Sequence, residues 1–287
     1  MPAWDPEGTR FTVERDGQRL ACEALGDGPP LILLHGITAS RRYVVHGSKM
    51  LPRAGFRTIA FDARGHGDSG PAPDAGGYSY DEMSADLGAV LDSEAAGEPA
   101  VVAGHSMGAH TVAAFALGNP ERLAGIVLIG PAYGGLPTSD EVLANWDALA
   151  DGLEQGGVDG FLAAYERQGL NPEWRDTLIR ITRERLLTHR HPDAVARALR
   201  EVPRDVPFEG MDELEFLDLP ALVVASRDEA DPGHPHAVAE AYAARLPAAR
   251  LISEDEGQSP LAWQGGKLSR EIARFCEEPA VAERASA

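Results

Sequence analysis

Residues 101–110, which read VVAGHSMGAH, constrain the fold of this chain more than any other stretch. The first half is apolar and predicts a buried strand, and apolar residues then continue at helical spacing as far as residue 117. A strand that turns into a helix within so few residues needs glycine where two backbones would meet. Gly104 and Gly108 flank Ser106 at those two points. We therefore predict a strand–turn–helix unit that holds Ser106 at a strained, exposed apex above a sheet.

Apolar runs typical of buried strands recur along the chain and alternate with helical patterns. The predicted parallel strands are residues 31–34, 57–61, 101–103, 125–130, 221–225 and 250–253. Residues 11–25 alternate around Asp16-Gly17, a turn dipeptide, and predict a β-hairpin. The alternation predicts an α/β fold with about eight strands, mostly parallel, and helices on both faces. We also expect a helix between Ser40 and Arg53 and a frayed tail after residue 277.

Residues 136–217 follow a different pattern, because helical spacing continues throughout and strand patterns are lacking. We expect a helical lid, inserted between two strands of a core made of residues 1–135 and 218–287. Such an insertion sits over the carboxyl ends of the strands, where open sheets of this kind bind ligands. The arginines from Arg175 to Arg200 fit either an anion site or the solvation of exposed helix faces, and we favour the second.

The charge balance limits the partners of the chain. Its 26 Lys and Arg against 45 Asp and Glu give a formal net charge of −19, which argues against nucleic acid or anionic membranes as partners.

The N-terminus lacks the regions of a signal peptide, and no apolar run approaches about 18 residues, so we expect a cytoplasmic protein. Two lone cysteines, Cys22 and Cys276, suit a reducing compartment. The sequence has no metal-ligand cluster and no nucleotide motif, so we expect a small-molecule substrate and no cofactor. The oligomeric state is left open.

Four motifs occur in one order along the predicted elements. They are His35-Gly36, the stretch DARGHGDS at residues 62–69, GHSMG at residues 104–108, and the strand 221–225 with Asp228 at its end. In this combination the chain resembles the α/β-hydrolase fold superfamily of the serine-nucleophile type. The resemblance covers nearly the whole sequence.

The resemblance implies that Ser106 is a catalytic nucleophile, whose hydroxyl attacks an acyl carbon. It also implies that the backbone N–H groups of Met107 and Ile37 hold the oxyanion that develops, since such an anion needs donors fixed in advance. His35 and Gly36 belong to the same loop as Ile37. His35 either takes part in the site or only braces its own loop, and both interpretations stay open.

The acid and the base of a triad are implied less directly. The acid of the family follows the strand 221–225, which indicates Asp228, with Asp231 as the local competitor. The histidine of the family follows the last short strand, usually just after a glycine. Here Gly257 is followed by Gln258, and no histidine occurs after His236. A glutamine can hydrogen-bond at this catalytic position, but it cannot accept a proton at useful pH.

Three explanations of Gln258 stay open. In the first, a histidine from elsewhere supplies the base, with His234 and His236 best placed because their loop follows the predicted acid. In the second, the pocket works without acyl-enzyme chemistry. In the third, position 258 carries an engineered, inactivating substitution.

The aromatic residues of the insertion bear on the substrate. Trp146 and Tyr165 predict a small, largely apolar ligand, unless they only pack the insertion onto the core. We expect an enzyme that acts on an ester or lactone through Ser106 with an altered triad. The alternatives are a non-hydrolytic cyclase, lyase or C–C bond enzyme with the same pocket, and a small-molecule binding protein without turnover.

Overall fold

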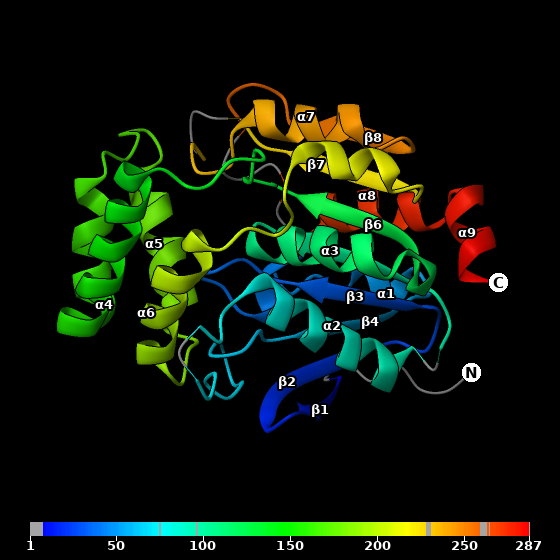
Figure 1. Cartoon of the computed structure of the whole chain (residues 1–287), viewed down its shortest axis with the longest axis horizontal. Coiled ribbons are helices and arrows are strands. Elements are labelled where there is room, and N and C mark those ends of the chain that lie inside the picture. The colour runs from blue at the N-terminus through cyan, green and yellow to red at the C-terminus, as the bar shows by residue number, and fades with distance from the viewer. Residues whose placement is uncertain are drawn as a thin grey trace.

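An eight-stranded sheet forms the centre of the computed structural model, which describes residues 8–74, 76–95, 97–227, 231–258, 263 and 265–286 (Figure 1). The strands are β1 (Thr9–Arg15), β2 (Gln18–Leu25), β3 (Pro30–Leu34), β4 (Arg57–Phe61), β5 (Ala100–His105), β6 (Leu123–Ile129), β7 (Ala221–Ala225) and β8 (Ala249–Ser253). They lie in the order β1-β2-β4-β3-β5-β6-β7-β8. Strand β2 pairs antiparallel with β1 and β4, and all other neighbours are parallel. The predicted α/β fold with a mostly parallel sheet is confirmed.

Two local features explain this sheet. Asp16 and Gly17 have φ angles of 49° and 81°, as a two-residue hairpin turn between β1 and β2 requires. Every residue of β6 is buried, because a central parallel strand is covered on both faces. The hairpin at the edge and the apolar central strands were therefore both predictable from short-range sequence patterns.

Helices cover both faces of the sheet. They are α1 (Met50–Arg53), α2 (Tyr80–Glu94), α3 (Met107–Gly118), α4 (Asp140–Arg167), α5 (Arg175–Leu186), α6 (Pro192–Glu201), α7 (His236–Arg245), α8 (Gly266–Cys276) and α9 (Pro279–Ala285), with 3-10 turns η1 (Arg41–Tyr43), η2 (Pro120–Arg122), η3 (Val202–Arg204) and η4 (Met211–Phe216). Helices α2, α3 and α7 share one apolar core with the sheet, and α1, α8 and α9 share another. Within the described ranges, none of these helices is both long and apolar enough to cross a bilayer.

The segment between β6 and β7 is helical. Residues 136–217 are all described and contain α4, α5, α6, η3 and η4 but no strand. Figure 1 shows α4, α5 and α6 gathered beyond the tips of the strand arrows. Their apolar residues form a third core cluster, which also includes Ile37 and Met107. The insertion therefore packs against the edge of the sheet that carries Ser106.

Two predictions of local structure are wrong. The helix expected between Ser40 and Arg53 is only η1 and the short α1, since His46 and Gly47 have left-handed φ angles of 49° and 69°. The tail expected to fray forms α9 instead. Helix α9 is held because Val281 is buried against the sheet and Arg284 donates to backbone carbonyls at the start of β6.

Both cysteines are core residues. Cys22 and Cys276 are buried and unbonded. Burial raises the pKa of each thiol to about 12, so neither is a thiolate near neutral pH. Both cysteines therefore fill the core.

Candidate active site

The turn between β5 and α3 holds Ser106 in a strained conformation. Ser106 has φ 53° and ψ −117°, and it is one of three non-glycine residues with positive φ in the described part of the chain. Its N–H donates to the Ile129 carbonyl at 2.9 Å, and its carbonyl accepts from the His110 N–H at 3.0 Å. A Cβ on Gly104 would lie 2.2 Å from the Gly108 carbonyl oxygen. The two glycines therefore allow the close crossing that presents Ser106, as the sequence predicted.

The loop that follows β3 passes directly beside Ser106. A Cβ on Gly36 would lie 3.2 Å from the Ser106 Cβ and 2.9 Å from His105 Nδ1, so only glycine lets the backbone approach this closely. Ile37 is buried in the same cluster as Met107, the first residue of α3. The backbone of this loop and the first turn of α3, whose N–H groups lack helical partners, thus meet next to Ser106.

The side chains of three histidines hydrogen-bond to three consecutive backbone carbonyls of this loop. His35 Nε2 accepts the Ala63 N–H at 2.9 Å, so its Nδ1 is the donor to the Gly36 carbonyl at 2.8 Å. His66 Nε2 lies 2.7 Å from the carbonyl of residue 37. His189, from the insertion, accepts the N–H of residue 67 at 2.9 Å and donates to the carbonyl of residue 38 at 3.2 Å. His35 therefore braces its own loop.

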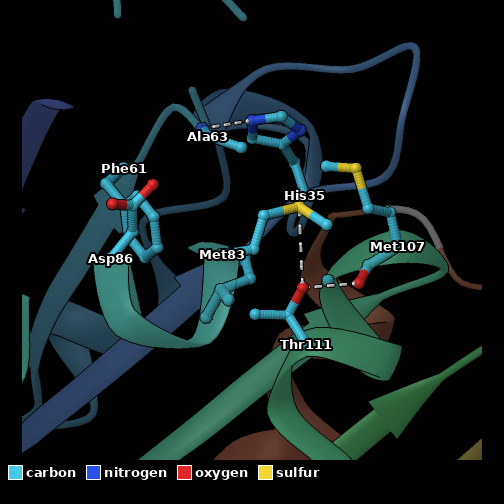
Figure 2. Close-up of a pocket in the computed structure, with 9 residues that line it drawn as sticks. His35, Phe61, Ala63, Met83, Asp86, Met107 and Thr111 are labelled. Carbon is cyan, nitrogen blue, oxygen red and sulfur yellow. Dashed lines mark hydrogen bonds between the residues drawn. The ribbon is translucent and has the colours of Figure 1, made fainter. Parts of the chain in front are cut away.

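A small cavity lies beneath this loop, between α2 and α3 (Figure 2). Its volume is about 10 Å³, roughly the space of one water molecule. His35 lines it from the loop after β3, and Met83, Met107 and Thr111 line it from the helices. The Thr111 hydroxyl is already used, because it donates to the Met107 carbonyl at 2.9 Å. The cavity is too small for a substrate and belongs to the packing below the site.

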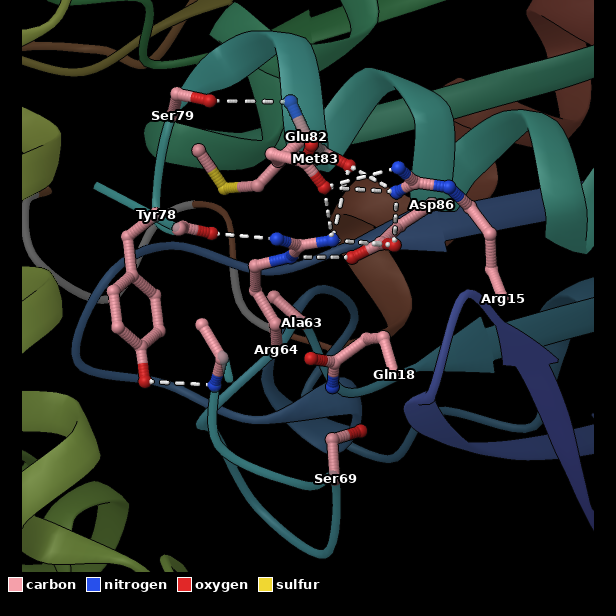
Figure 3. A network of polar contacts seen from close by, with 12 residues as sticks. Arg15, Gln18, Ala63, Arg64, Ser69, Tyr78, Ser79, Glu82, Met83 and Asp86 are labelled. Carbon is pink, nitrogen blue, oxygen red and sulfur yellow. Dashed lines mark hydrogen bonds and ion pairs between the residues drawn. The ribbon is translucent and has the colours of Figure 1, made fainter. Parts of the chain in front are cut away.

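A buried ionic network anchors the neighbouring loop after β4 (Figure 3). Arg64 donates to both oxygens of Asp86 on α2, at 2.8 and 2.9 Å, and both side chains are almost fully buried. Arg15 from β1 bonds the same carboxylate and Glu82. A paired and fully bonded buried charge avoids the cost of an isolated one. The network fixes the loop whose His66 supports the carbonyl of residue 37.

Asp231 and His234 form a hydrogen-bonded pair near the ends of β5 and β6. His234 Nδ1 lies 2.8 Å from Asp231 Oδ1. The His234 side chain is 17% exposed and the Asp231 side chain 34% exposed, so a ligand can reach both. The His234 ring centre is 5.1 Å from that of His105, the residue before Ser106. A Cβ on Gly130 would lie 3.3 Å from His234 Cγ. Since Gly130 follows β6, the direct neighbour of β5, the pair lies one strand away from Ser106.

Each member of this pair shifts the pKa of the other. Burial alone would lower the pKa of His234, but the Asp231 carboxylate outweighs it and raises that pKa above its ordinary value. Burial likewise favours the neutral acid, but His234 holds the pKa of Asp231 below its ordinary value, with help from His105 and Arg185. Burial lowers the pKa of His105 well below its ordinary value. Asp231 is therefore a carboxylate placed to orient His234 and to stabilise its protonated form.

The structure separates the other predicted residues of the triad. Gln258 is exposed and hydrogen-bonds with Lys267 at 3.2 Å and Asp255 at 3.5 Å, so neither of its hydrogen bonds is to Ser106. His236 Nε2 lies 3.1 Å from Ser253 Oγ, at the end of β8. Asp228 lies outside the described residues. Within the described part of the chain, no hydrogen bond joins the Ser106 hydroxyl to His234 or His236.

Side chains of the insertion lie over the same region. Trp146 and Tyr165 are partly buried against the cluster that contains Ile37 and Met107, so they pack the insertion onto the core. Burial raises the pKa of Tyr165, and the charge of Asp231 adds to the effect. No group of three or more His, Cys, Asp or Glu within the described ranges is arranged to hold a metal ion.

Sequence reasoning did not recognise the pairing of Asp231 with His234. The signal was present, because residues 231–234 read DPGH, with proline at the second position of a four-residue turn. The His234 N–H donates to the Asp231 carbonyl at 3.0 Å and closes this turn. The contribution of His189 was also missed, because it contacts loops that are distant in the sequence.

Comparison with known proteins identifies the family. A family model described as alpha/beta hydrolase fold matches residues 29–261. The chain belongs to this family. The prediction of a hydrolase-fold enzyme is therefore confirmed at the level of the family, including its eight-stranded sheet.

Individual relatives match shorter regions. A non-heme haloperoxidase of Mycobacterium phage D29 is 38% identical over 122 residues, which are 42% of this chain and 43% of that protein. Epoxide hydrolase B of Mycobacterium tuberculosis is 39% identical over 108 residues, or 38% of this chain and 30% of that one. The matches thus span less than half of these curated relatives. A thermophilic esterase from Thermogutta terrifontis superposes with a TM-score of 0.74 at 26% identity, covering 93% of this chain and 97% of the esterase.

Proposed function

We propose that this protein hydrolyses an ester or lactone of a small molecule, with Ser106 as nucleophile and His234 as general base oriented by Asp231. The observation that carries the proposal is the Asp231–His234 pair one strand from the serine turn. It favours the first explanation of Gln258, in which a histidine from elsewhere supplies the base. The match to an esterase over most of both chains supports the same reaction class.

The hydrogen bond to Asp231 determines how His234 can act. With its Nδ1–H directed at the carboxylate, the neutral ring has its lone pair on Nε2. In the proposed reaction, Nε2 takes the Ser106 proton as Oγ attacks the carbonyl carbon, and the carbonyl π electrons move to the oxygen. The backbone N–H groups of Ile37 and Met107 would hold that oxyanion.

The intermediate then collapses and the acyl group stays on the serine. The protonated His234 gives its proton to the departing alkoxide, which leaves as an alcohol or, from a lactone, stays attached as a hydroxyl. A water molecule attacks the acyl-enzyme while His234 accepts its proton, and this proton returns to Ser106 Oγ as the acid is released. Ester and water are consumed, and acid and alcohol are formed.

Apolar surroundings favour a largely apolar body for the substrate. Ile37, Met107, Trp146 and Tyr165 belong to, or pack against, one apolar cluster over the Ser106 edge. In this proposal the insertion of residues 136–217 acts as a lid that covers the acyl group and excludes water. A closed apolar site also strengthens the electrostatic interaction between oxyanion and backbone donors.

The proposal is tested by labelling the serine with a fluorophosphonate. We expect covalent labelling of the wild-type protein and none of Ser106→Ala, with p-nitrophenyl ester hydrolysis at least about a thousandfold slower in the variant. Absence of labelling together with tight ligand binding would instead identify a binding protein. Labelling without turnover of esters or lactones would point to a non-hydrolytic enzyme with the same pocket.

A further inference from the structure

We propose that Arg185 is an anion-binding residue of the active site and that the substrate carries a carboxylate in addition to the carbonyl that is attacked. This inference rests on the proposed hydrolase function and names its substrate class more closely. It revises the expectation that all arginines of the insertion only solvate helix faces.

Arg185 differs from the other arginines of its helix. Arg175, Arg180 and Arg183 on α5 each form an ion pair with a carboxylate, and each keeps about half or more of its side-chain exposure. Arg185 forms no ion pair within the described part of the chain, and its Nε is buried without a hydrogen-bond partner. A buried donor without an acceptor is costly, so such a group needs an explanation.

The last turn of α5 places Arg185 at the loop that supports Ser106. The Thr188 hydroxyl lies 2.6 Å from the Arg185 carbonyl and 3.1 Å from the Ser40 hydroxyl, which joins the end of α5 to the loop after β3. The guanidinium carbon of Arg185 lies 5.9 Å from the centre of the Tyr43 ring, a cation–π contact. The arginine is thus held by the segment that begins at Gly36.

The charge of Arg185 acts on the catalytic groups themselves. It contributes to lowering the pKa of His105 and of Asp231, and it opposes the raised pKa of His234. Asp231 is the one carboxylate among the groups that act on Arg185, and its Oδ1 is already bonded to His234. The guanidinium therefore acts electrostatically on the pair, and no ion pair gives it a carboxylate of its own among the described residues.

A carboxylate of the substrate suits this place. The planar guanidinium offers two parallel donors that match the two oxygens of a carboxylate. One guanidinium balances one negative charge, which favours a carboxylate over a phosphate dianion. Bound there, the carboxylate would accept from Arg185 and direct the rest of the substrate toward Ser106.

An open groove lies beside Tyr43, the residue that Arg185 contacts. It has a volume of about 460 Å³ and is lined by Arg42, Tyr43, His46, Glu184 and Leu187. Tyr43 is common to this groove and to the cation–π contact of Arg185. The single carboxylate of the lining, Glu184, is paired with Arg180, so it is partly neutralised.

Two matched esters test the inference. Mono-4-nitrophenyl adipate carries a free carboxylate, and 4-nitrophenyl heptanoate is a neutral ester of similar length. We expect Arg185→Gln to lower the ratio of kcat/KM for the adipate to kcat/KM for the heptanoate at least about tenfold. Arg185→Lys should retain part of the preference, since it keeps the charge but loses the planar fork. The control Arg183→Gln removes an exposed arginine of the same helix and should change neither substrate.

An equal loss for both esters in Arg185→Gln, or a wild-type preference for the heptanoate, would overturn the inference. A binding measurement distinguishes failure of the anion-site inference from failure of the proposed hydrolysis. In Ser106→Ala, calorimetry should show tighter binding of monomethyl adipate than of dimethyl adipate, and Arg185→Gln should remove the difference. That difference supports the anion site even if neither ester is turned over. Equal binding of the two esters, or binding of neither, contradicts it.

Discussion

At the scale of the residue, the proposal of His234 as general base depends on one turn. The family resemblance predicted a histidine where the chain carries Gln258, and it left His234 and His236 as candidate replacements. The structure directs Gln258 toward Lys267 and His236 toward Ser253, whereas His234 pairs with Asp231. A one-dimensional motif comparison cannot find such a replacement, because it compares positions in the chain and not positions in space.

The His234–Asp231 pair predicts a pH profile. Because the base acts when neutral, kcat/KM for a p-nitrophenyl ester should rise with pH through the pKa of His234, which Asp231 raises above its ordinary value of 6.5. Asp231→Asn removes the carboxylate, so the inflection should move to lower pH. His234→Ala should lower kcat/KM by about 10²–10⁴-fold.

Gln258→Ala serves as the matched control for this profile, since its side chain is exposed and bonded away from the serine. It should stay within about twofold of the wild type. A loss in Gln258→Ala as large as that in His234→Ala, or an inflection that Asp231→Asn leaves in place, would exclude His234 as the base.

At the scale of the element, the unit of β5 and α3 was predictable, and the segment before α1 was not. The strand, the glycines and the helix all follow from residues within a few positions of Ser106, so local pattern was sufficient. Between Ser40 and Arg53 the apolar spacing suggested one helix, but His46 and Gly47 adopt left-handed φ angles that end it. A positive φ at a non-glycine residue is set by packing, which sequence spacing does not contain.

Gly108→Ala tests how closely α3 packs on the sheet. A Cβ at this position would lie 2.5 Å from the Leu34 carbonyl oxygen, so α3 has to shift away from β3. We expect the free energy of unfolding, measured with urea, to fall by about 1–3 kcal/mol. Gly118→Ala, at the other end of α3, meets no atom within 4 Å and should be neutral or stabilising by up to about 1 kcal/mol. Similar effects of the two variants would show that the close approach at Gly108 is unimportant.

At the scale of the whole molecule, neutral histidines connect the insertion, the loops and the sheet. His189 joins the insertion to the loops after β3 and β4. His110 on α3 pairs with Tyr80 on α2 and accepts the N–H groups of residues 132 and 133, between β6 and the insertion. Burial lowers the pKa of His110 and His189 to about 3 each, with help from a neighbouring histidine in both cases.

These histidines predict loss of stability in acid. The unfolded chain takes up their protons near pH 6.5 while the folded protein does not, so stability falls as the pH decreases below about 6.5. Between pH 6.5 and 5 the free energy of unfolding should fall by on the order of 2 kcal/mol per histidine. Urea unfolding at both pH values measures this.

His189→Gln isolates the effect, because acid also reduces the net charge of −19 and so relieves repulsion. The variant should lose less stability than the wild type over the same interval, by about the contribution of one histidine. An identical decline in both proteins would show that His189 is not held neutral by the fold.

The sequence by itself determined the order of strands and helices, the helical insertion, the strained serine turn and the family. Apolar periodicity and the steric demands of glycine act between near neighbours, so the chain carries this information locally. Only the tertiary structure decided which histidine pairs with a carboxylate one strand from Ser106, and which arginine of the insertion has a buried Nε without a hydrogen-bond partner. Those contacts join the ends of different strands to the insertion, and their partners depend on where distant backbones meet.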